Sequence, residues 1–172
     1  MDDRSRNVAV RVPGRGRRLL GSMPTREIGS SLLAGLGGCG VILLLAELTV
    51  RLEHALLIAP FGASCVLVFG LPQSPLAHPR NVIGGHLIAT ATGLAVLALL
   101  GATPLAFGAS VGLAIAAMLL TGTVHPPAGA DPIVVILAGA GWSFLFIPVL
   151  AGAVTIVLAG LAFRAIVSAR SG

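Results

Sequence analysis

The sequence predicts an all-α membrane protein with about six transmembrane segments, of which four are long and two are short and broken. Hydrophobic residues make up 56% of the 172 residues and charged residues only 10%, whereas about a quarter of a soluble domain is charged. The mean hydropathy is +1.00. Several apolar runs approach or reach the roughly 20 residues that a bilayer-spanning helix needs. We therefore expect an integral membrane protein surrounded by a lipid bilayer.

Positive charge is concentrated in residues 1–28, which we expect to be a disordered, basic, cytosolic tail before a transmembrane domain at 29–168. Seven of the 11 basic residues, all of them arginine, lie before residue 29. The tail has no aromatic residue and leads directly into an apolar run, so positive-inside anchoring is favoured over nucleic-acid binding. An organelle transit peptide stays open as an alternative. We expect a bacterial inner membrane, with both termini in the cytoplasm.

The first half of the domain contains two long apolar runs with a short one between them. Residues 29–50 have the length of one span, and residues 82–100 have the length of another. Residues 56–71 are apolar but short, and Pro60 and Gly62 interrupt them. Proline removes a backbone hydrogen bond, so this middle segment is predicted to be a broken helix.

The second half repeats this order after a tight connection. Residues 105–121 form a span and residues 148–167 form the last one, with a short apolar segment at 132–140 between them. The run 125–131, His-Pro-Pro-Ala-Gly-Ala-Asp, precedes the short segment. A break of this kind is tolerated in a membrane only where it lines a cavity or is surrounded by protein, so the run indicates a functional site.

The two short segments resemble each other at an offset of 67 residues. Between residues 58 and 96 the offset gives 9 identities in 39 positions, where composition alone predicts about four. Units 29–101 and 102–168 would then form a 3+3 inverted repeat, as in many transporters. Coincidence of composition is the alternative. Whether the short segments cross the membrane or are re-entrant also stays open.

The start of each short helix is a candidate anion site. Glycine and alanine leave the backbone bare, and free amides together with the helix dipole form a positive pole. Ser64 and Asp131 are expected to cap these helix starts, or Asp131 to be a protonatable group. The candidate substrate-binding residues are Pro60, Gly62, Ala63, Ser64, Pro127, Gly129, Ala130 and Asp131. Ordinary kinks without a ligand are the alternative.

Two histidines lie near these segments. His86 falls inside an apolar span and His125 directly precedes the prolines. An ionisable residue at membrane depth is often functional, so we include both as contacts to substrate or as parts of a proton path. Structural hydrogen bonding is the alternative for each. Secondary candidates are Arg80 as a loop charge or anion attractor, Asn81 as a helix cap, and Gly84 and Gly85 as points of close backbone approach.

The sequence has none of the signatures of common enzymes. No Ser, His and Asp occur in an order with a supporting motif, no His and Cys have metal-ligand spacing, and no phosphate loop is present. Cys39 and Cys65 are typical of small packing residues in apolar runs. We therefore expect no enzymatic activity, no cofactor and no metal.

Three motifs occur together and in order. They are Pro60-Phe61-Gly62-Ala63-Ser64, Arg80-Asn81-x-x-Gly84-Gly85-His86 and His125-Pro126-Pro127-Ala128-Gly129-Ala130. With them the chain resembles the HPP family of integral membrane proteins over about residues 27–168. The family is usually described with four membrane helices, and some members are implicated in nitrite transport. The resemblance implies a small-anion transporter and assigns no role to single residues.

These observations together predict a transporter of a small monovalent anion, with nitrite as the first candidate and the site at two facing helix N-termini. A channel-like pore for a small solute and a non-transporting subunit of a membrane assembly are the alternatives. We also expect a homo-oligomer, because residues 35–40 offer a glycine-rich face for close helix packing.

Overall fold

The computed structural model describes residues 25–169, and the side chains of residues 27–169. Every element in this range is a helix, so the predicted all-α class is confirmed. The long helices are α1 (Thr25–Leu52), α3 (Pro79–Leu100), α4 (Pro104–Thr121) and α6 (Ala151–Ala169). Residues 1–24, most of the predicted tail, lie outside the described range, and helix α1 begins four residues earlier than the predicted span at Gly29.

Shorter elements separate the long helices. They are α2 (Pro60–Cys65), η2 (Val66–Gly70), η3 (Pro75–Ala77), η4 (Pro126–Ala130), α5 (Asp131–Ala138), η5 (Trp142–Leu145) and η6 (Phe146–Leu150). Among the described residues, four helices are long and apolar enough to cross a membrane. The continuous helices Pro60–Gly70 and Pro126–Ala138 are apolar but shorter than 18 residues. At about 1.5 Å per residue, neither helix alone is long enough to span the roughly 30 Å hydrocarbon core of a bilayer.

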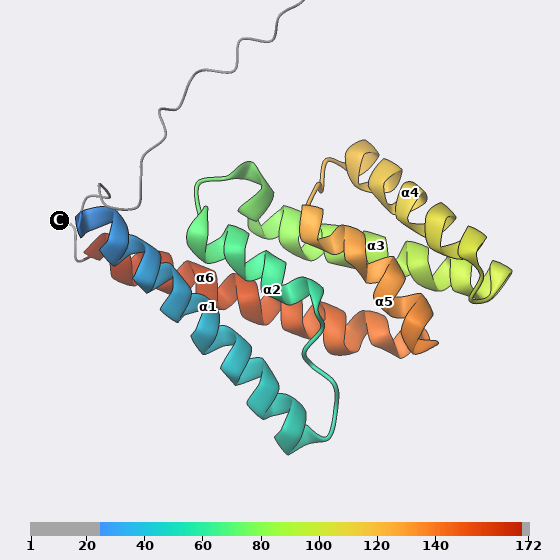
Figure 1. The fold of residues 1–172 in the computed structure, drawn as a ribbon, viewed down its shortest axis with the longest axis horizontal. Coiled ribbons are helices and arrows are strands. Elements are labelled where there is room, and N and C mark those ends of the chain that lie inside the picture. The colour runs from blue at the N-terminus through green and yellow to red at the C-terminus, as the bar shows by residue number, and fades with distance from the viewer. Residues whose placement is uncertain (1–24, 170–172) are drawn as a thin grey trace, which may run out of the picture.

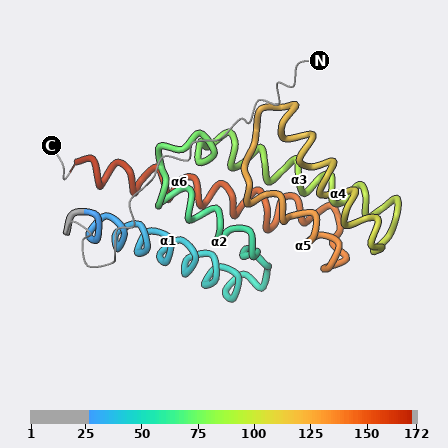
Figure 2. The backbone as a smooth tube through the Cα atoms, turned by 45° about the horizontal axis from the view of Figure 1, so that its top comes forward, coloured from blue at the N-terminus to red at the C-terminus, as the bar shows by residue number. Residues whose placement is uncertain are grey.

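Successive helices run in alternating directions along the long axis of the molecule. Figures 1 and 2 show α1, α3 and α5 running one way and α2, α4 and α6 running back. The start of α1 and the end of α6 consequently lie at the same end of the molecule (Figures 1 and 2). Helix α3 packs against α4, α5, η4 and α6, so this helix of the first half contacts most of the second half.

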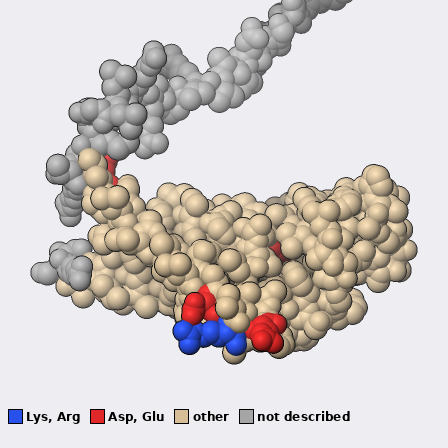
Figure 3. All heavy atoms as spheres, turned by 60° about the horizontal axis from the view of Figure 1, so that its bottom comes forward, with Lys and Arg blue, Asp and Glu red and all other residues tan. Residues whose placement is uncertain are grey.

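The larger hydrophobic core lies where α1, α2, α3 and α6 meet. Leu45 of α1, Phe61 of α2, Val82 of α3 and Ile156 of α6 are all fully buried in one cluster. Unlike a soluble protein, the molecule exposes mostly apolar side chains. Figure 3 shows a face with few charged side chains, apart from one cluster that contains both positive and negative charges. Only 11% of the most apolar stretch of α1 is buried. This apolar exterior suits contact with lipid.

Pairs of residues related by the offset of 67 make reciprocal contacts. A Cβ atom built on Gly93 of α3 would lie 3.4 Å from the Cβ of Val135 on α5. A Cβ atom on Gly160 of α6 would touch the side chain of Val68 on η2. Each glycine thus lets its helix approach the short segment of the other half. A two-fold relation between the halves would produce this pattern, and the inverted repeat itself stays a prediction.

Candidate functional site

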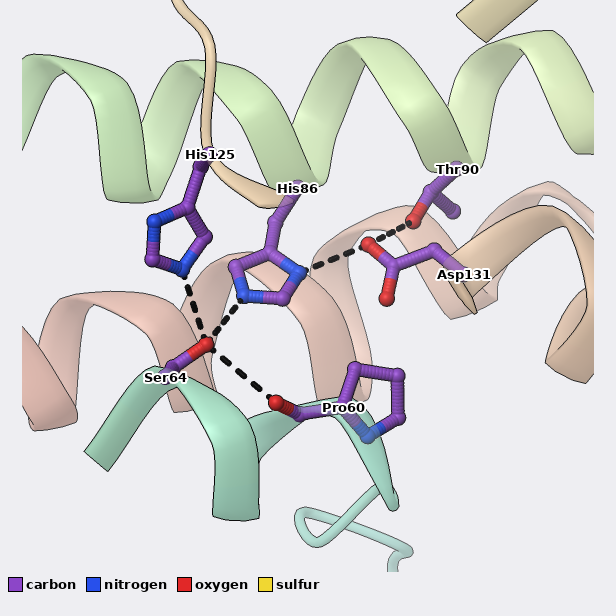
Figure 4. A network of polar contacts seen from close by, with 6 residues as sticks. All are labelled: Pro60, Ser64, His86, Thr90, His125 and Asp131. Carbon is purple, nitrogen blue, oxygen red and sulfur yellow. Dashed lines mark hydrogen bonds and ion pairs between the residues drawn. The ribbon is translucent and has the colours of Figure 1, made fainter. Parts of the chain in front are cut away.

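The two short segments meet against α3 at a cluster of polar side chains. We call Ser64, His86, His125 and Asp131 the polar network. The Ser64 Oγ on α2 lies 2.9 Å from Nε2 of His86 and 2.9 Å from Nε2 of His125 (Figure 4). It also lies 3.3 Å from the main-chain oxygen of Pro60, one turn earlier in the same helix. A single hydroxyl therefore joins the two histidines.

The opposite edge of the His86 ring faces a carboxylate. His86 Nδ1 lies 2.7 Å from Oδ2 of Asp131, the first residue of α5. The Thr90 hydroxyl donates to the same oxygen at 3.2 Å. Among the described residues, Asp131 Oδ1 is buried and has no hydrogen-bond partner. The carboxylate is thus held on one oxygen only.

The ring of His125 is anchored by the backbone. Its Nδ1 lies 2.8 Å from the main-chain oxygen of Leu76, in the short helix η3. A carbonyl oxygen only accepts, so Nδ1 of His125 donates. The centroids of the His86 and His125 rings are 5.1 Å apart. The Phe61 ring meets His86 edge to face, with 5.2 Å between the ring centroids. Both rings are therefore fixed on several sides.

All members of the polar network, and Thr90 beside them, are fully buried. Burying polar groups inside an apolar protein is costly unless each is hydrogen-bonded, and this cost is largest for charged groups. Among the described residues, Asp131 is the carboxylate in the polar network. Its partner is His86, which is charged only when protonated. The arrangement can hold and exchange protons, because it contains two imidazoles, a hydroxyl and a carboxylate in contact.

Gly84 and Gly85 allow the segment before the prolines to lie on α3. A Cβ atom on Gly85 would be 2.7 Å from the Cβ of His125 and 2.9 Å from the backbone oxygen of Thr123. A Cβ atom on Gly84 would be 2.9 Å from the Thr123 side chain. The predicted close approach is present, and it is what places His125 beside His86.

The helix starts differ from the expectation of bare amides. The amides of Phe61 and Gly62 donate to the carbonyls of Ile58 and Ala59, because the backbone of Ala59 is already helical. The amide of Ala128 donates to the carbonyl of His125. These amides are therefore occupied by the preceding turn.

The expected caps are also wrong. Neither α2 nor α5 has a side-chain cap at its start. The hydroxyl of Ser64 and the carboxylate of Asp131 instead contact the histidines. Ser64 is the fifth residue of α2, and Asp131 follows an N-cap residue, Ala130, whose backbone is already helical.

Other predicted residues lie near the network but outside it. Gly62 and Ala63 are exposed, and Gly62 lines an apolar groove of about 470 Å³ between α1 and α2. A Cβ atom on Gly62 or Gly129 would meet nothing within 4 Å. Ala130 is exposed and Pro127 is half-buried. The first and third motifs thus bring together Ser64 and His125, while Gly62 and Gly129 leave open space.

Arg80 and Asn81 bind main-chain carbonyls. Arg80 Nη2 donates to the carbonyl of Thr121 at 2.9 Å, at the end of α4, where a positive charge complements the helix dipole. Asn81 Nδ2 donates to the carbonyl of Pro75 at 3.1 Å. The predicted cap at Asn81 is wrong, because α3 begins at Pro79 and its N-cap is His78. The proline at the first turn of α3 begins that helix three residues earlier than the apolar run does.

Three participants were not among the predicted residues. Thr90 lies four residues after His86 and so on the same face of α3, a spacing that the sequence does contain. Phe61 is inside the first motif but is apolar. The Leu76 contact carries no sequence signal, because every residue has a main-chain carbonyl.

Among the described residues, no group of three or more His, Cys, Asp or Glu side chains is placed to hold a metal ion.

Comparison with known proteins agrees with this architecture. The profile of the HPP transmembrane region matches residues 22–172. The chain belongs to the HPP transmembrane family. This HPP chain is 37% identical over 144 residues to one transmembrane protein of Dictyostelium discoideum, covering 78% of the chain and 46% of the relative. It is 36% identical over 147 residues to a second transmembrane protein of that organism, covering 78% of the chain and 50% of the relative.

The HPP chain therefore spans about half the length of these curated relatives. No solved structure matches it. Family membership together with four apolar helices of spanning length makes the chain an integral membrane protein. All three motifs that carried the resemblance lie inside the matched residues.

Proposed function

We propose that this protein is a carrier for a small monovalent anion, with nitrite as the first candidate. The observation that supports it is the polar network, which is buried between apolar helices and joins both short segments to α3. Ionisable groups at such depth are costly and commonly mark a transport or proton pathway. A subunit that only assembled with partners would gain nothing from this cost.

The complete burial of the network favours a carrier over an open pore. Ser64, His86, His125 and Asp131 are all 0% exposed. A continuous water-filled pore would expose the polar groups that line it. A carrier instead passes through an occluded state, and movement of the short segments against α3 would open it alternately to each side.

The anion in this proposal binds beside a protonated imidazole. The backbone amides of Phe61, Gly62 and Ala128 already donate to carbonyls, so their N–H groups are not free to bind an anion without a rearrangement. His86 and His125 are the two groups of the network that gain positive charge by taking up a proton. An anion adjacent to either would compensate that charge.

The test is uptake into proteoliposomes that contain the purified protein. Initial rates are measured for nitrite, nitrate, formate, chloride and bicarbonate over a range of concentrations. Saturable uptake of one or more anions, lost in the doubly substituted His86→Ala/His125→Ala protein, supports the proposal. Gly112→Ala is a matched control, because Gly112 is exposed on α4 with open space around it.

Two outcomes would contradict the carrier. Uptake that rises linearly with concentration would indicate the pore. No uptake above empty liposomes, for protein that is folded and correctly inserted, would favour the non-transporting assembly subunit.

The N- and C-termini are proposed to face the cytoplasm, because seven arginines precede residue 29.

A further inference from the structure

The hydrogen bonds of the polar network cannot all be satisfied without one additional proton. His125 Nδ1 donates to the Leu76 carbonyl, so a neutral His125 has an Nε2 that only accepts. His86 Nδ1 lies against the Asp131 carboxylate, so a neutral His86 that donates to it also has an accepting Nε2. Both Nε2 atoms lie 2.9 Å from Ser64 Oγ.

A hydroxyl has one hydrogen and can donate to only one of the two nitrogens. With both histidines neutral and Asp131 ionised, one of the 2.9 Å contacts would set a lone pair against a lone pair. One further proton removes this conflict. Either histidine can carry it on Nε2 and donate to Ser64, while Ser64 donates to the other. The network is then electrically neutral, which suits complete burial and the unpaired Oδ1 of Asp131.

We propose that Ser64 is a hydroxyl switch that passes this single proton between His86 and His125. The proposal rests on the proposed carrier function, for which it supplies the path of a coupled proton. In one state His86 is the cation paired with Asp131, and Ser64 donates to His125. In the other state His125 is the cation, and Ser64 donates to His86.

Transfer between the two states balances with no other reactant. The Nε2–H bond of His86 breaks as its proton forms a bond to Ser64 Oγ. The original O–H bond of Ser64 breaks as that proton forms a bond to Nε2 of His125. The hydroxyl is regenerated, and one positive charge has moved from the α3 side to the segment that precedes the prolines. The Pro60 oxygen, at 3.3 Å, is a third and more distant neighbour of the hydroxyl.

No other charged side chain among the described residues contacts this path. Helix α4 and the short helices η3 and η4 contain no ionisable residue. Helix α2 adds Cys65, which is buried in the apolar core cluster. Helix α6 adds Arg164, whose guanidinium donates to the carbonyls of Gly160 and Pro72. When no anion is bound, Asp131 is therefore the counter-charge within the network for either histidine.

The order Ser64, His86 and Asp131 also has the contacts of a nucleophilic triad. One observation favours the switch. The remaining side of Ser64 Oγ is occupied by a second histidine, His125. A nucleophile needs a free approach to its oxygen, and a relay needs a partner on each side.

The decisive measurement is nitrogen NMR of the two imidazoles in protein labelled with ¹⁵N-histidine and embedded in lipid bilayers. Exposed His54 and His78 are removed by His54→Gln and His78→Asn to leave the pair alone. We expect His125 Nδ1 to be protonated and both Nε2 signals to be averaged between protonated and unprotonated forms. Ser64→Ala should remove the averaging, and Ser64→Thr, which keeps the hydroxyl, should restore it.

Ser110→Ala is the matched control, since Ser110 is also fully buried but donates only to the carbonyl of Phe107. Two static Nε2 signals in the unsubstituted protein, unchanged by Ser64→Ala, would overturn the switch. Covalent labelling of Ser64 by a fluorophosphonate would also overturn it, in favour of a nucleophile. Neither readout requires transport, so failure of the carrier proposal leaves this test intact.

A second measurement follows protons and anion together in liposomes that contain a pH-sensitive dye. We expect anion uptake to carry protons in a fixed ratio, and Ser64→Ala to lower proton uptake by about tenfold or more while Ser110→Ala keeps it. Anion uptake without proton movement in the unsubstituted protein would overturn the coupling role. Absence of anion uptake altogether would count against the carrier, and the NMR result would still decide the switch.

Discussion

The imidazole of His125 is held by the main-chain carbonyl of Leu76, with 2.8 Å between Nδ1 and the oxygen. The two residues are separated by 49 positions, and the contact joins the loop before α3 to the segment before the prolines. It determines which nitrogen of His125 carries a permanent hydrogen. The other nitrogen, Nε2, is thereby left to exchange a proton with Ser64. This backbone contact therefore decides which nitrogen of His125 takes part in the network.

The first prediction separates the two contacts of His125. In His125→Asn the side-chain amide nitrogen can replace Nδ1 and still donate to the Leu76 carbonyl, but nothing reaches Ser64. In His125→Ala both contacts are lost, and leaving the part-buried Leu76 carbonyl unpaired costs up to about 1–3 kcal/mol. We therefore expect Ala to lower the unfolding temperature more than Asn, and both to abolish the pH dependence of anion uptake. Equal loss of stability would show that the Leu76 contact contributes little.

The second prediction concerns the carboxylate. Asp131→Ala removes the partner of His86 Nδ1 and of the Thr90 hydroxyl, so two buried donors lose an acceptor. Thr90→Val removes one hydrogen bond and leaves the His86 contact intact. We expect Asp131→Ala to destabilise by about 1–3 kcal/mol or more, and Thr90→Val by about 0.5–1.5 kcal/mol. Denaturation of both variants in nanodiscs measures the difference, and a larger loss for Thr90→Val would contradict the assigned contacts.

The third prediction tests the reciprocal packing of the two halves. A Cβ atom on Gly93 would lie 2.7 Å from the backbone Cα of Pro132, and one on Gly160 would overlap the Val68 side chain. Gly93→Ala and Gly160→Ala should therefore each cost about 1–3 kcal/mol through overpacking. Gly112→Ala meets nothing within 4 Å and should be neutral or up to about 1 kcal/mol stabilising, since alanine favours a helix. Thermal unfolding of the three variants under identical conditions makes the comparison.

The fourth prediction is a homo-oligomer that packs through α1. Only 11% of the most apolar stretch of this helix is buried in the monomer. Gly35 and Gly40 are exposed, with open space around them. Close helix packing in a membrane favours such small residues. Gly35→Leu should shift the protein to smaller species by native mass spectrometry from nanodiscs, and Gly112→Leu should not. A monomer in the unsubstituted protein would contradict the expectation.

Much of the fold was predictable because membrane helices are specified locally. Each long span appears as a continuous apolar run, and lipid requires every backbone group in it to be paired within the helix. The helix ends were less predictable. The run at 82–100 marks the apolar part of α3, but Pro79 begins the helix because proline fits the first turn. The tail before residue 29 showed only its charge, and α1 extends into it to Thr25.

The site was predictable in its members and not in its chemistry. The motifs contain Ser64, His86 and His125, and Asp131 directly follows the third motif; each is a polar residue in an apolar setting. Helix capping was the local interpretation for Ser64 and Asp131, because a cap requires only neighbours in sequence. Their actual partners lie 22 to 61 residues away. No local pattern contains that information.

The sequence by itself determined that this protein lies in a membrane, that it has four long and two short apolar helices, and that polar residues accompany the breaks. Hydrophobicity and the loss of a hydrogen bond at proline are properties of the chain at each position, so they can be deduced without a fold. The tertiary structure alone decided that one hydroxyl bridges two histidines. The contact with His125 requires the glycines on α3 that let the segment before the prolines lie against this helix, and packing between distant segments depends on the whole fold.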